Sequence, residues 1–393
     1  MALAASGLMQ ASCLSGPKRD NLAIFDAMWR TMDEWYFDPT MNDLDWPAVW
    51  REWRPHAAKA ETQAALYLDV LVPVLDQFAS SHVDIRPPSI ITLSKGRSFR
   101  MPRQKPGSPN LLSSTDEAGL GAKLTWVSSI FVVEDVELSS PAYEAGLRPG
   151  QKVGLFSFRH LNTDHKELQL IETPSNRIIT ARWTPKPLPP KTERRTLDDG
   201  TGYLRFNVFD QGSIDWVSTN IQQAPPSRLI LDLRENVGGV IAEVARLLSV
   251  LLPVGSNIGT FKTRQGISRG KTLPSPVTFS RPLAVLMGPR TASGGEITAA
   301  ALQHDRRARL FGAKTAGAVL GSRTFSLPDN GKLTVPFSDY FSPAGFRIEG
   351  MGLSPDVAIA RTPQSARKNI DPALLAASQW LSQQKGPGVS AEA

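Results

Sequence analysis

The hydrophobic positions of the N-terminal part of the chain follow a helical pattern. Between residues 21 and 78, apolar side chains recur at helical intervals, first from Ile24 to Tyr36 and again from Leu66 to Leu75. The next segment, Ser80–Pro88, alternates in polarity and ends in two prolines, which predicts a short strand followed by a turn. Residues 89–115 are polar and contain Pro, Ser and Gly, so a loop is expected there.

A change of composition begins a second region, residues 115–185, which is rich in strand-forming side chains. Residues 129–133 and 177–183 have strand character. Between them, residues 139–150 read as a short helix that ends at a glycine and a turn. The apolar pattern alone predicts a small β-rich domain here, followed by a Pro/Lys linker at residues 185–190.

After the linker, segments with strand character alternate with segments of helical spacing. The predicted strands are residues 202–209, 228–234, 283–288 and 308–311, and the predicted helices are residues 240–252 and 294–304. Strands that are separated by helices usually pair in parallel. This region therefore predicts a parallel sheet covered by helices on both faces.

Composition and charge exclude several classes of protein. The chain has 393 residues, of which 41% are hydrophobic and 21% are charged, values typical of a globular protein with two or three domains. No apolar stretch is long enough to span a bilayer. The net charge is +7, but the basic residues are scattered among acidic ones, so we expect a mildly basic surface and no nucleic-acid partner.

The single cysteine, Cys13, excludes an internal disulfide and a CxxC metal site. It follows two small residues, Ala11 and Ser12, as in bacterial lipoprotein signals. We therefore predict a truncated lipoprotein-type signal in residues 1–20, export to the periplasm, and lipidation of Cys13 as a membrane anchor. The alternative is a disordered N-terminus of a cytoplasmic protein. Residues 384–393 are predicted to form a disordered tail.

A serine lies at the start of a predicted helix, directly after a predicted buried strand. In the segment Arg290–Ile297 this serine is Ser293, and a turn there exposes its hydroxyl. The free N–H groups of the helix start then face the group that the serine attacks, so developing negative charge meets donors, as acyl transfer requires. The simpler interpretation is that Ser293 only caps the helix.

Four motifs occur in order along the chain: LDQFASSHVDIRPP, LILDLRENVGG, TASGGEITAAALQ and FRIEGMGLSPDV. Together they resemble peptidase family S41, the carboxy-terminal processing and tricorn-like serine proteases, and SPAYEAGLRPGQKV is similar to part of a PDZ domain. The resemblance implies a multidomain α/β fold. Its expected parts are an N-terminal helical region with a strand that carries a Ser–His pair (residues 21–110), an inserted PDZ-like β-rich domain (residues 115–185) and a crotonase/ClpP-like catalytic core (residues 190–370).

Members of this family differ in the general base that activates the serine. One branch uses a lysine in a GxxTxGK segment, but here that segment is Gly312–Ala318, and Ala318 occupies the lysine's place. Lys314 lies nearby but out of register, and it is kept as a weaker alternative base. The resemblance therefore disfavours a Ser–Lys dyad.

The tricorn-like branch uses a histidine, a second serine and a glutamate, and the resemblance assigns these roles to His82, Ser81 and Glu349. Because a serine is too weakly acidic to ionise alone, His82 would take the proton of Ser293 and pass it to the leaving amine. Ser81 and Glu349 would orient and stabilise the imidazolium. Each of these residues could instead be structural: a satisfied histidine, a strand serine and a solvated turn glutamate.

The resemblance also assigns the oxyanion hole. Its donors would be the N–H groups of Gly238 and Gly294, with Gly239 as the alternative to Gly238. The plain interpretation of Gly238–Gly239 is a loop that joins a strand to a helix. In the PDZ-like domain, the loop of Gly119, Leu120 and Gly121 would present N–H groups to the C-terminal carboxylate of a peptide.

The predicted function is that of a serine endopeptidase that forms an acyl-enzyme on Ser293. Its partners would be protein or peptide substrates, approached through their C-terminal tails. The alternative is a catalytically inactive protein of the same fold that binds a peptide or an apolar ligand. The sequence has no HExxH motif, no clustered metal ligands and no P-loop, so no metal or cofactor is expected, and the oligomeric state is left open.

Overall fold

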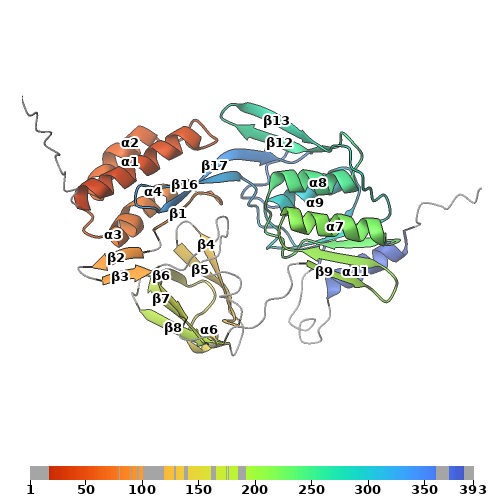
Figure 1. Ribbon diagram of the computed structural model, residues 1–393, viewed down its shortest axis with the longest axis horizontal. Helices are drawn as coiled ribbons and strands as arrows, with labels where there is room; N and C mark the ends of the chain where they lie inside the picture. Colours follow the sequence, from red (N-terminus) through yellow and green to blue (C-terminus); the bar gives the residue numbers. More distant parts are fainter. Residues whose placement is uncertain are drawn as a thin grey trace, which may run out of the picture.

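The computed structural model describes most of the chain between residues 17 and 384 (Figure 1). The described residues are 17–78, 80–88, 90–94, 97–100, 119–127, 130–136, 140–160, 165–173, 175, 177–184, 192–359 and 371–384. Cys13, the predicted linker at residues 185–190 and the tail after residue 384 lie outside them.

Helices dominate the N-terminal region, in agreement with its apolar pattern. They are α1 (Pro17–Trp35), α2 (Trp46–Lys59), α3 (Gln63–Leu66), the π-helix η1 (Tyr67–Leu71) and α4 (Val72–Asp76). Asp45 caps α2, because its carboxylate accepts a hydrogen bond from the Ala48 N–H. Trp29 stacks on Trp46 at a ring-centroid distance of 5.9 Å, which joins α1 and α2 through a buried aromatic core.

The strand expected at residues 80–88 is shorter than predicted, and it does not carry the Ser–His pair. β1 spans only Asp84–Arg86, whereas Ser81 and His82 lie in the turn before it. Pairing with β17 (Lys332–Phe341) involves only the three residues of β1, so alternation in polarity overestimated the strand. The loop expected after β1 contains a hairpin, formed by β2 (Ile90–Ser94) and β3 (Arg97–Arg100).

A five-stranded antiparallel sheet forms the middle of the chain, where the sequence predicts a β-rich domain. Its strands, in spatial order, are β4 (Ala122–Val127), β5 (Ile130–Val136), β6 (Lys152–His160), β7 (Lys166–Thr173) and β8 (Ile178–Trp183). The apolar pattern did not predict β4, β6 and β7. The short helix α6 (Pro141–Glu144) begins at Ser140, whose Oγ accepts a hydrogen bond from the Tyr143 N–H at 3.2 Å.

A six-stranded sheet forms the C-terminal core. Four of its strands, β10, β11, β14 and β15, fall in the four predicted strand segments and pair in parallel, as predicted. Its order is β18–β15–β14–β11–β10–β9, with β9 antiparallel to β10 and the other pairs parallel. The strands are β9 (Thr192–Thr196), β10 (Gly202–Phe206), β11 (Leu229–Asp232), β14 (Leu283–Met287), β15 (Arg309–Gly312) and β18 (Val357–Ala358).

Helices cover both faces of this sheet, as predicted (Figure 1). One face packs against α7 (Gln211–Gln223), α8 (Ile241–Leu251) and α9 (Gly294–His304), and the other face packs against α11 (Pro372–Ser382). No helix within the described ranges is both long enough and apolar enough to cross a membrane.

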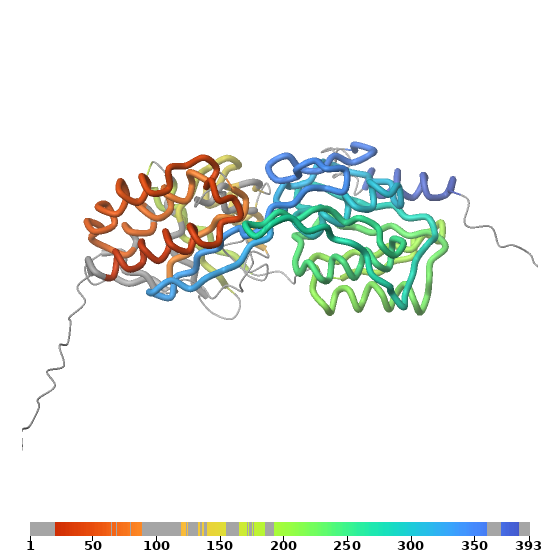
Figure 2. The backbone as a smooth tube through the Cα atoms, turned by 90° about the horizontal axis from the view of Figure 1, so that it is seen from above, coloured from red at the N-terminus to blue at the C-terminus, as the bar shows by residue number. Residues whose placement is uncertain are grey.

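A second sheet connects the N-terminal region to this core. It contains β12 (Asn257–Thr263), β13 (Gly266–Lys271) and β16 (Gly321–Ser326), together with β1 and the long strand β17. One end of β17 pairs with β1 and the other end pairs with β12. β17 extends between the N-terminal helices and the core (Figures 1 and 2), and so brings the turn before β1 toward the core.

Candidate active site

The candidate nucleophile, Ser293, lies on a sharp turn between β14 and α9. It is the residue immediately before α9, and its backbone angles are φ 49° and ψ −117°. Positive φ is costly for a residue other than glycine and persists only where the surroundings hold it. The Ser293 N–H donates to the Ala318 carbonyl at 2.8 Å, which fixes the turn from the neighbouring loop. Ser293 therefore occupies a position that the fold determines.

Glu296, which the sequence analysis did not select, anchors this turn. Its buried carboxylate accepts hydrogen bonds from the N–H groups of Ser293 (3.2 Å), Gly317 (2.8 Å) and Ala318 (2.9 Å), and from the Thr315 hydroxyl. Burial raises the pKa of Glu296, and these hydrogen bonds oppose that rise. The Ser-x-x-Glu spacing of a helix capping box was the signal in the sequence that could have identified it.

The glycine loop after β11 lies directly against the candidate nucleophile. Gly238 has φ +91°, and a Cβ atom added there would lie 2.5 Å from the Ser293 Cβ and 2.8 Å from the Gly294 nitrogen. The Gly238 N–H donates to Asn236 Oδ1 at 2.9 Å, so it is engaged inside its own loop. The N–H groups of Gly239 and Gly294 have no acceptor within the described part of the chain.

The side chains of Ser81 and His82 contact each other in the turn before β1. Ser81 Oγ lies 2.6 Å from His82 Nδ1, so the other ring nitrogen, Nε2, is left for a different partner. The Ser81 N–H donates to Glu349 Oε1 at 3.1 Å. Glu349 is 7% exposed, and its other oxygen accepts a hydrogen bond from the Val319 N–H at 2.9 Å. The carboxylate thus holds the Ser–His turn against the segment that follows β15.

This network brings three of the predicted groups into one neighbourhood. Val319, which binds Glu349, directly follows Ala318, whose carbonyl accepts the Ser293 N–H. His82 and Ser293 are therefore connected through Glu349 and one short loop segment. No hydrogen bond joins His82 to Ser293 among the residues that the structure describes.

Burial lowers the pKa of His82 below its ordinary value, and the negative charge of Glu349 opposes this shift. The partial removal of the imidazole from water disfavours its charged form, so the ring is neutral near pH 7. A neutral imidazole can accept a proton. The nearby carboxylate stabilises the imidazolium that results.

The remaining predicted residues are placed elsewhere. Lys314, the alternative base, is an exposed side chain, whereas Ala318 at the other end of that segment contacts the nucleophile turn. Gly119 and Gly121 have φ values of +93° and +71° and flank Leu120, which is fully buried. The described part of the chain contains no group of three or more His, Cys, Asp or Glu side chains that could hold a metal ion.

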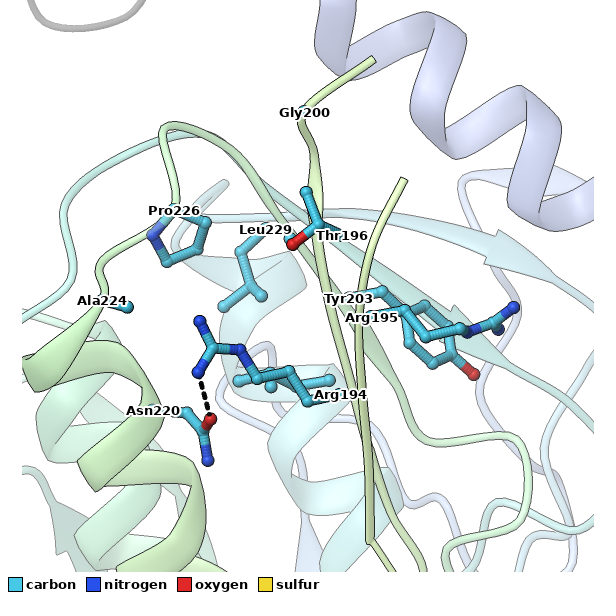
Figure 3. A pocket seen from close by; sticks show the side chains of 11 residues that line it. Arg194, Arg195, Thr196, Gly200, Tyr203, Asn220, Ala224, Pro226 and Leu229 are labelled. Carbon is cyan, nitrogen blue, oxygen red and sulfur yellow. Dashed lines mark hydrogen bonds between the residues drawn. The ribbon is translucent and has the colours of Figure 1, made fainter. Parts of the chain in front are cut away.

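Of two pockets in the described part of the chain, one adjoins the candidate site and the other lies away from it. One, of about 350 Å³, is lined by Ser80 and Glu349 and therefore adjoins the Ser–His turn. The other, of about 190 Å³, lies between β9, β10 and α7, where Arg194 donates to Asn220 Oδ1 (Figure 3). That second pocket includes the first residues of β10 and β11, whereas Ser293 follows the opposite end of the parallel strands. It is thus separate from the candidate site.

Comparison with known proteins gives matches over both ends of the chain. Residues 200–359 match Peptidase family S41, and residues 17–71 match the Tricorn protease C1 domain. The carboxyl-terminal-processing protease of Synechocystis is 25% identical over 95% of this chain and 90% of its own length. The carboxy-terminal-processing protease of Bartonella bacilliformis is also 25% identical, over 65% of this chain and 64% of its own length.

A solved structure shares the overall fold. It is the photosystem II D1 C-terminal processing protease, which is 22% identical and superposes with a TM-score of 0.57 over 86% of this chain and 93% of its own. At this identity, the likeness concerns the fold. The α/β architecture is thus that of a known processing protease.

Proposed function

Because this chain belongs to peptidase family S41, we propose that it is a serine endopeptidase in which Ser293 forms an acyl-enzyme and His82 is the general base. The observation that carries the proposal is the network around Glu349, which connects the Ser81–His82 turn to the loop that holds Ser293. The proposed substrates are proteins or peptides.

In the proposed mechanism, the Ser293 oxygen attacks the carbonyl carbon of the scissile peptide bond and its proton passes to His82 Nε2. For Nε2 to accept this proton, Nδ1 must carry the other hydrogen, which Ser81 Oγ accepts at 2.6 Å. The imidazolium then gives its proton to the leaving amine, and the C–N bond breaks. Water, deprotonated by the same imidazole, hydrolyses the acyl-enzyme and restores the serine.

The tetrahedral intermediate needs two donors for its negative oxygen. Gly294 is proposed as one of them, because its N–H lies beside the nucleophile and has no acceptor within the described residues. The second is Gly239, whose N–H is similarly unoccupied, or Gly238, which must first release Asn236 Oδ1. Either choice leaves the glycine loop as one wall of the oxyanion hole.

The test of this function combines labelling with cleavage. A fluorophosphonate probe should label the protein at the peptide that contains Ser293, as mapped by mass spectrometry, and the unlabelled protein should cleave casein or a peptide with an unstructured C-terminal tail. Labelling should eliminate the cleavage. A protein that neither reacts nor cleaves but binds a C-terminal peptide would instead be the inactive binder.

The pH dependence of the reaction follows from the environment of His82. Because burial depresses its pKa, the imidazole stays neutral to a lower pH than usual, so the acid limb of kcat/KM should have its midpoint below about pH 6.5. Glu349→Gln removes the charge that opposes this depression. In that variant the midpoint should move to a still lower pH. An acid limb that does not respond to Glu349→Gln would contradict the electrostatic role of Glu349.

We further propose that the middle sheet is a PDZ-like domain that receives substrate tails. Its loop of Gly119, Leu120 and Gly121 is anchored to α6, because the Leu120 carbonyl accepts from the Ala142 N–H at 3.0 Å and Ser140 Oγ donates to the Gly121 carbonyl at 3.1 Å. An anchored loop with both glycines at positive φ suits the presentation of N–H groups to a peptide carboxylate. The export of the protein and lipidation of Cys13 stay predictions from the sequence.

A further inference from the structure

Three consecutive residues in the N-terminal region have a left-handed backbone. Met41, Asn42 and Asp43, between α1 and α2, have φ values of 54°, 55° and 63°. None is a glycine: Asn42 and Asp43 are of the types that tolerate this backbone best after glycine, whereas it costs Met41 about 1–2 kcal/mol. Such strain persists only where other contacts hold it, and it concentrates at functional sites. The left-handed turn (Met41–Asp43) therefore needs a structural explanation.

Interactions on both sides of the turn hold it in place. The side chain of Met41 is 3% exposed and belongs to the aromatic core of the N-terminal region. The Asp38 carboxylate accepts hydrogen bonds from the Thr40 N–H at 3.0 Å and from the Asn42 N–H at 3.3 Å. The Asn42 amide then reaches two residues at the edge of the aromatic core, the Tyr36 side chain and the Phe78 carbonyl.

Asn42 holds the beginning of that segment. Its Nδ2 donates to the Phe78 carbonyl at 3.1 Å. Phe78 belongs to the aromatic core, with its ring centroid 4.8 Å from that of Tyr36 and 5.3 Å from that of Trp46, and Val83 and Ile85 return to the same core after the Ser–His turn. His82 follows four residues later in the chain. The bond from Asn42 thus holds the core residue that precedes the Ser–His turn, and Val83 anchors the chain directly after it.

The Ser–His turn has open space on one side. Asn42, Phe78, Ser80 and Glu349 all line the pocket of about 350 Å³ that adjoins this turn. The hydrogen bonds on this side include the bond from Asn42 to Phe78 before the turn and the bond from Ser81 to Glu349 within it. Loss of either would allow the turn to shift into the pocket.

We infer that Asn42 is a positioning residue, whose strained turn and amide hydrogen bond to Phe78 fix the placement of the catalytic base His82. This inference rests on the proposed function of His82. Asparagine suits both requirements, because it tolerates left-handed backbone better than most residues and its amide supplies a donor. Aspartate at position 42 would keep the size of the side chain but lose the N–H donor to Phe78. Glycine would keep the left-handed turn but lose the side chain.

The test uses Asn42→Gly and Asn42→Asp in the full chain. Glycine relieves backbone strain, which offsets part of the loss of the hydrogen bonds from the Asn42 side chain to Phe78 and Tyr36, so Asn42→Gly should fold, with only a small fall in its unfolding temperature. Both variants should lower kcat for peptide cleavage by about five- to tenfold, with KM nearly unchanged. A looser turn also admits water to His82, so the acid limb of kcat/KM should move to higher pH.

A matched control separates this effect from backbone strain. Asn330, in the turn between β16 and β17, is also exposed and also has a positive φ, of 68°. Asn330→Gly should therefore change neither kcat nor the acid limb. The inference is overturned if Asn42→Gly and Asn330→Gly have the same kcat and pH profile.

A second readout does not depend on catalysis. Hydrogen exchange of the amides in the Ser80–Asp84 segment should be several-fold faster in Asn42→Gly than in the original protein and unchanged in Asn330→Gly. Unchanged exchange in Asn42→Gly overturns the inference even if the enzyme is inactive on every substrate tried. Faster exchange in a protein that never acylates Ser293 would instead support the tether and contradict the proposed function.

Discussion

Replacing Ser293 with alanine is expected to reduce kcat/KM for peptide cleavage by more than about 10⁴-fold and to abolish labelling by a fluorophosphonate. The variant retains every other group of the site but has no oxygen to form the acyl-enzyme. Folding should persist, because the bonds that hold this turn, to Ala318 and Glu296, are made by the Ser293 backbone N–H, and only the side-chain cap of α9, of about 1 kcal/mol, is lost. The measurements are the steady-state cleavage rate, covalent labelling by intact mass, and the unfolding temperature.

Two outcomes for Ser293→Ala would contradict the role of Ser293 as nucleophile. Labelling that persists at the original stoichiometry would show that a different nucleophile reacts. Loss of labelling together with a large fall in the unfolding temperature would make the role of Ser293 structural. Only loss of labelling in a folded protein agrees with the proposed mechanism.

Gly238→Ala is expected to lower kcat/KM by at least about 10²-fold. An added Cβ would lie 2.5 Å from the Ser293 Cβ and 2.8 Å from the Gly294 nitrogen, both of which belong to a rigid turn. One of the two loops must therefore move, and a displacement of about 1 Å near a nucleophile is sufficient for a loss of this size. The positive φ of Gly238, +91°, adds strain that destabilises the loop by about 1 kcal/mol. The measurements are kcat/KM and the rate of fluorophosphonate labelling.

Gly255→Ala is the matched control for this variant. Gly255 has φ +84°, and a Cβ added there would meet no atom within 4 Å. It therefore introduces comparable backbone strain without the collision at Ser293, and it should keep nearly full activity. Similar activities for Gly238→Ala and Gly255→Ala would show that the glycine loop does not form a wall of the site.

The main features of the core could be predicted from the sequence because they depend on local patterns. The helix predicted at residues 294–304 is α9, Gly294–His304, because a capping serine precedes a run composed mostly of apolar and small residues. The apolar runs at residues 228–234 and 283–288 contain β11 and β14, which are buried on both faces. In these cases one segment carries all the information that the element needs.

Other features depend on partners far away in the sequence. β1 is limited to three residues by its pairing with β17, so alternation near Ser81 and His82 could not show that this pair lies in a turn. β6 and β7 escaped prediction even though they are long strands that pair over most of their length. Strand pairing is a tertiary property, and the pattern of a single segment does not record it.

In the candidate site, too, some residues could be identified from the sequence and others could not. The resemblance of four motifs predicted Ser293, Ser81, His82 and Glu349, and the structure places them around connected loops. Glu296 carried a local signal, the Ser-x-x-Glu spacing. Asn42 carried none, because its left-handed backbone and its bond to the Phe78 carbonyl exist only once two separate segments have packed together.

The most direct test of the central claim is the rate at which a fluorophosphonate phosphonylates Ser293, with loss of fluoride, in His82→Ala, compared with the rate in Lys314→Ala over the same pH range. If His82 is the general base, its loss should slow phosphonylation by about 10²- to 10⁴-fold and remove the acid limb, whereas Lys314→Ala should react as fast as the original protein. Phosphonylation that is unchanged in His82→Ala but lost in Lys314→Ala would contradict the account.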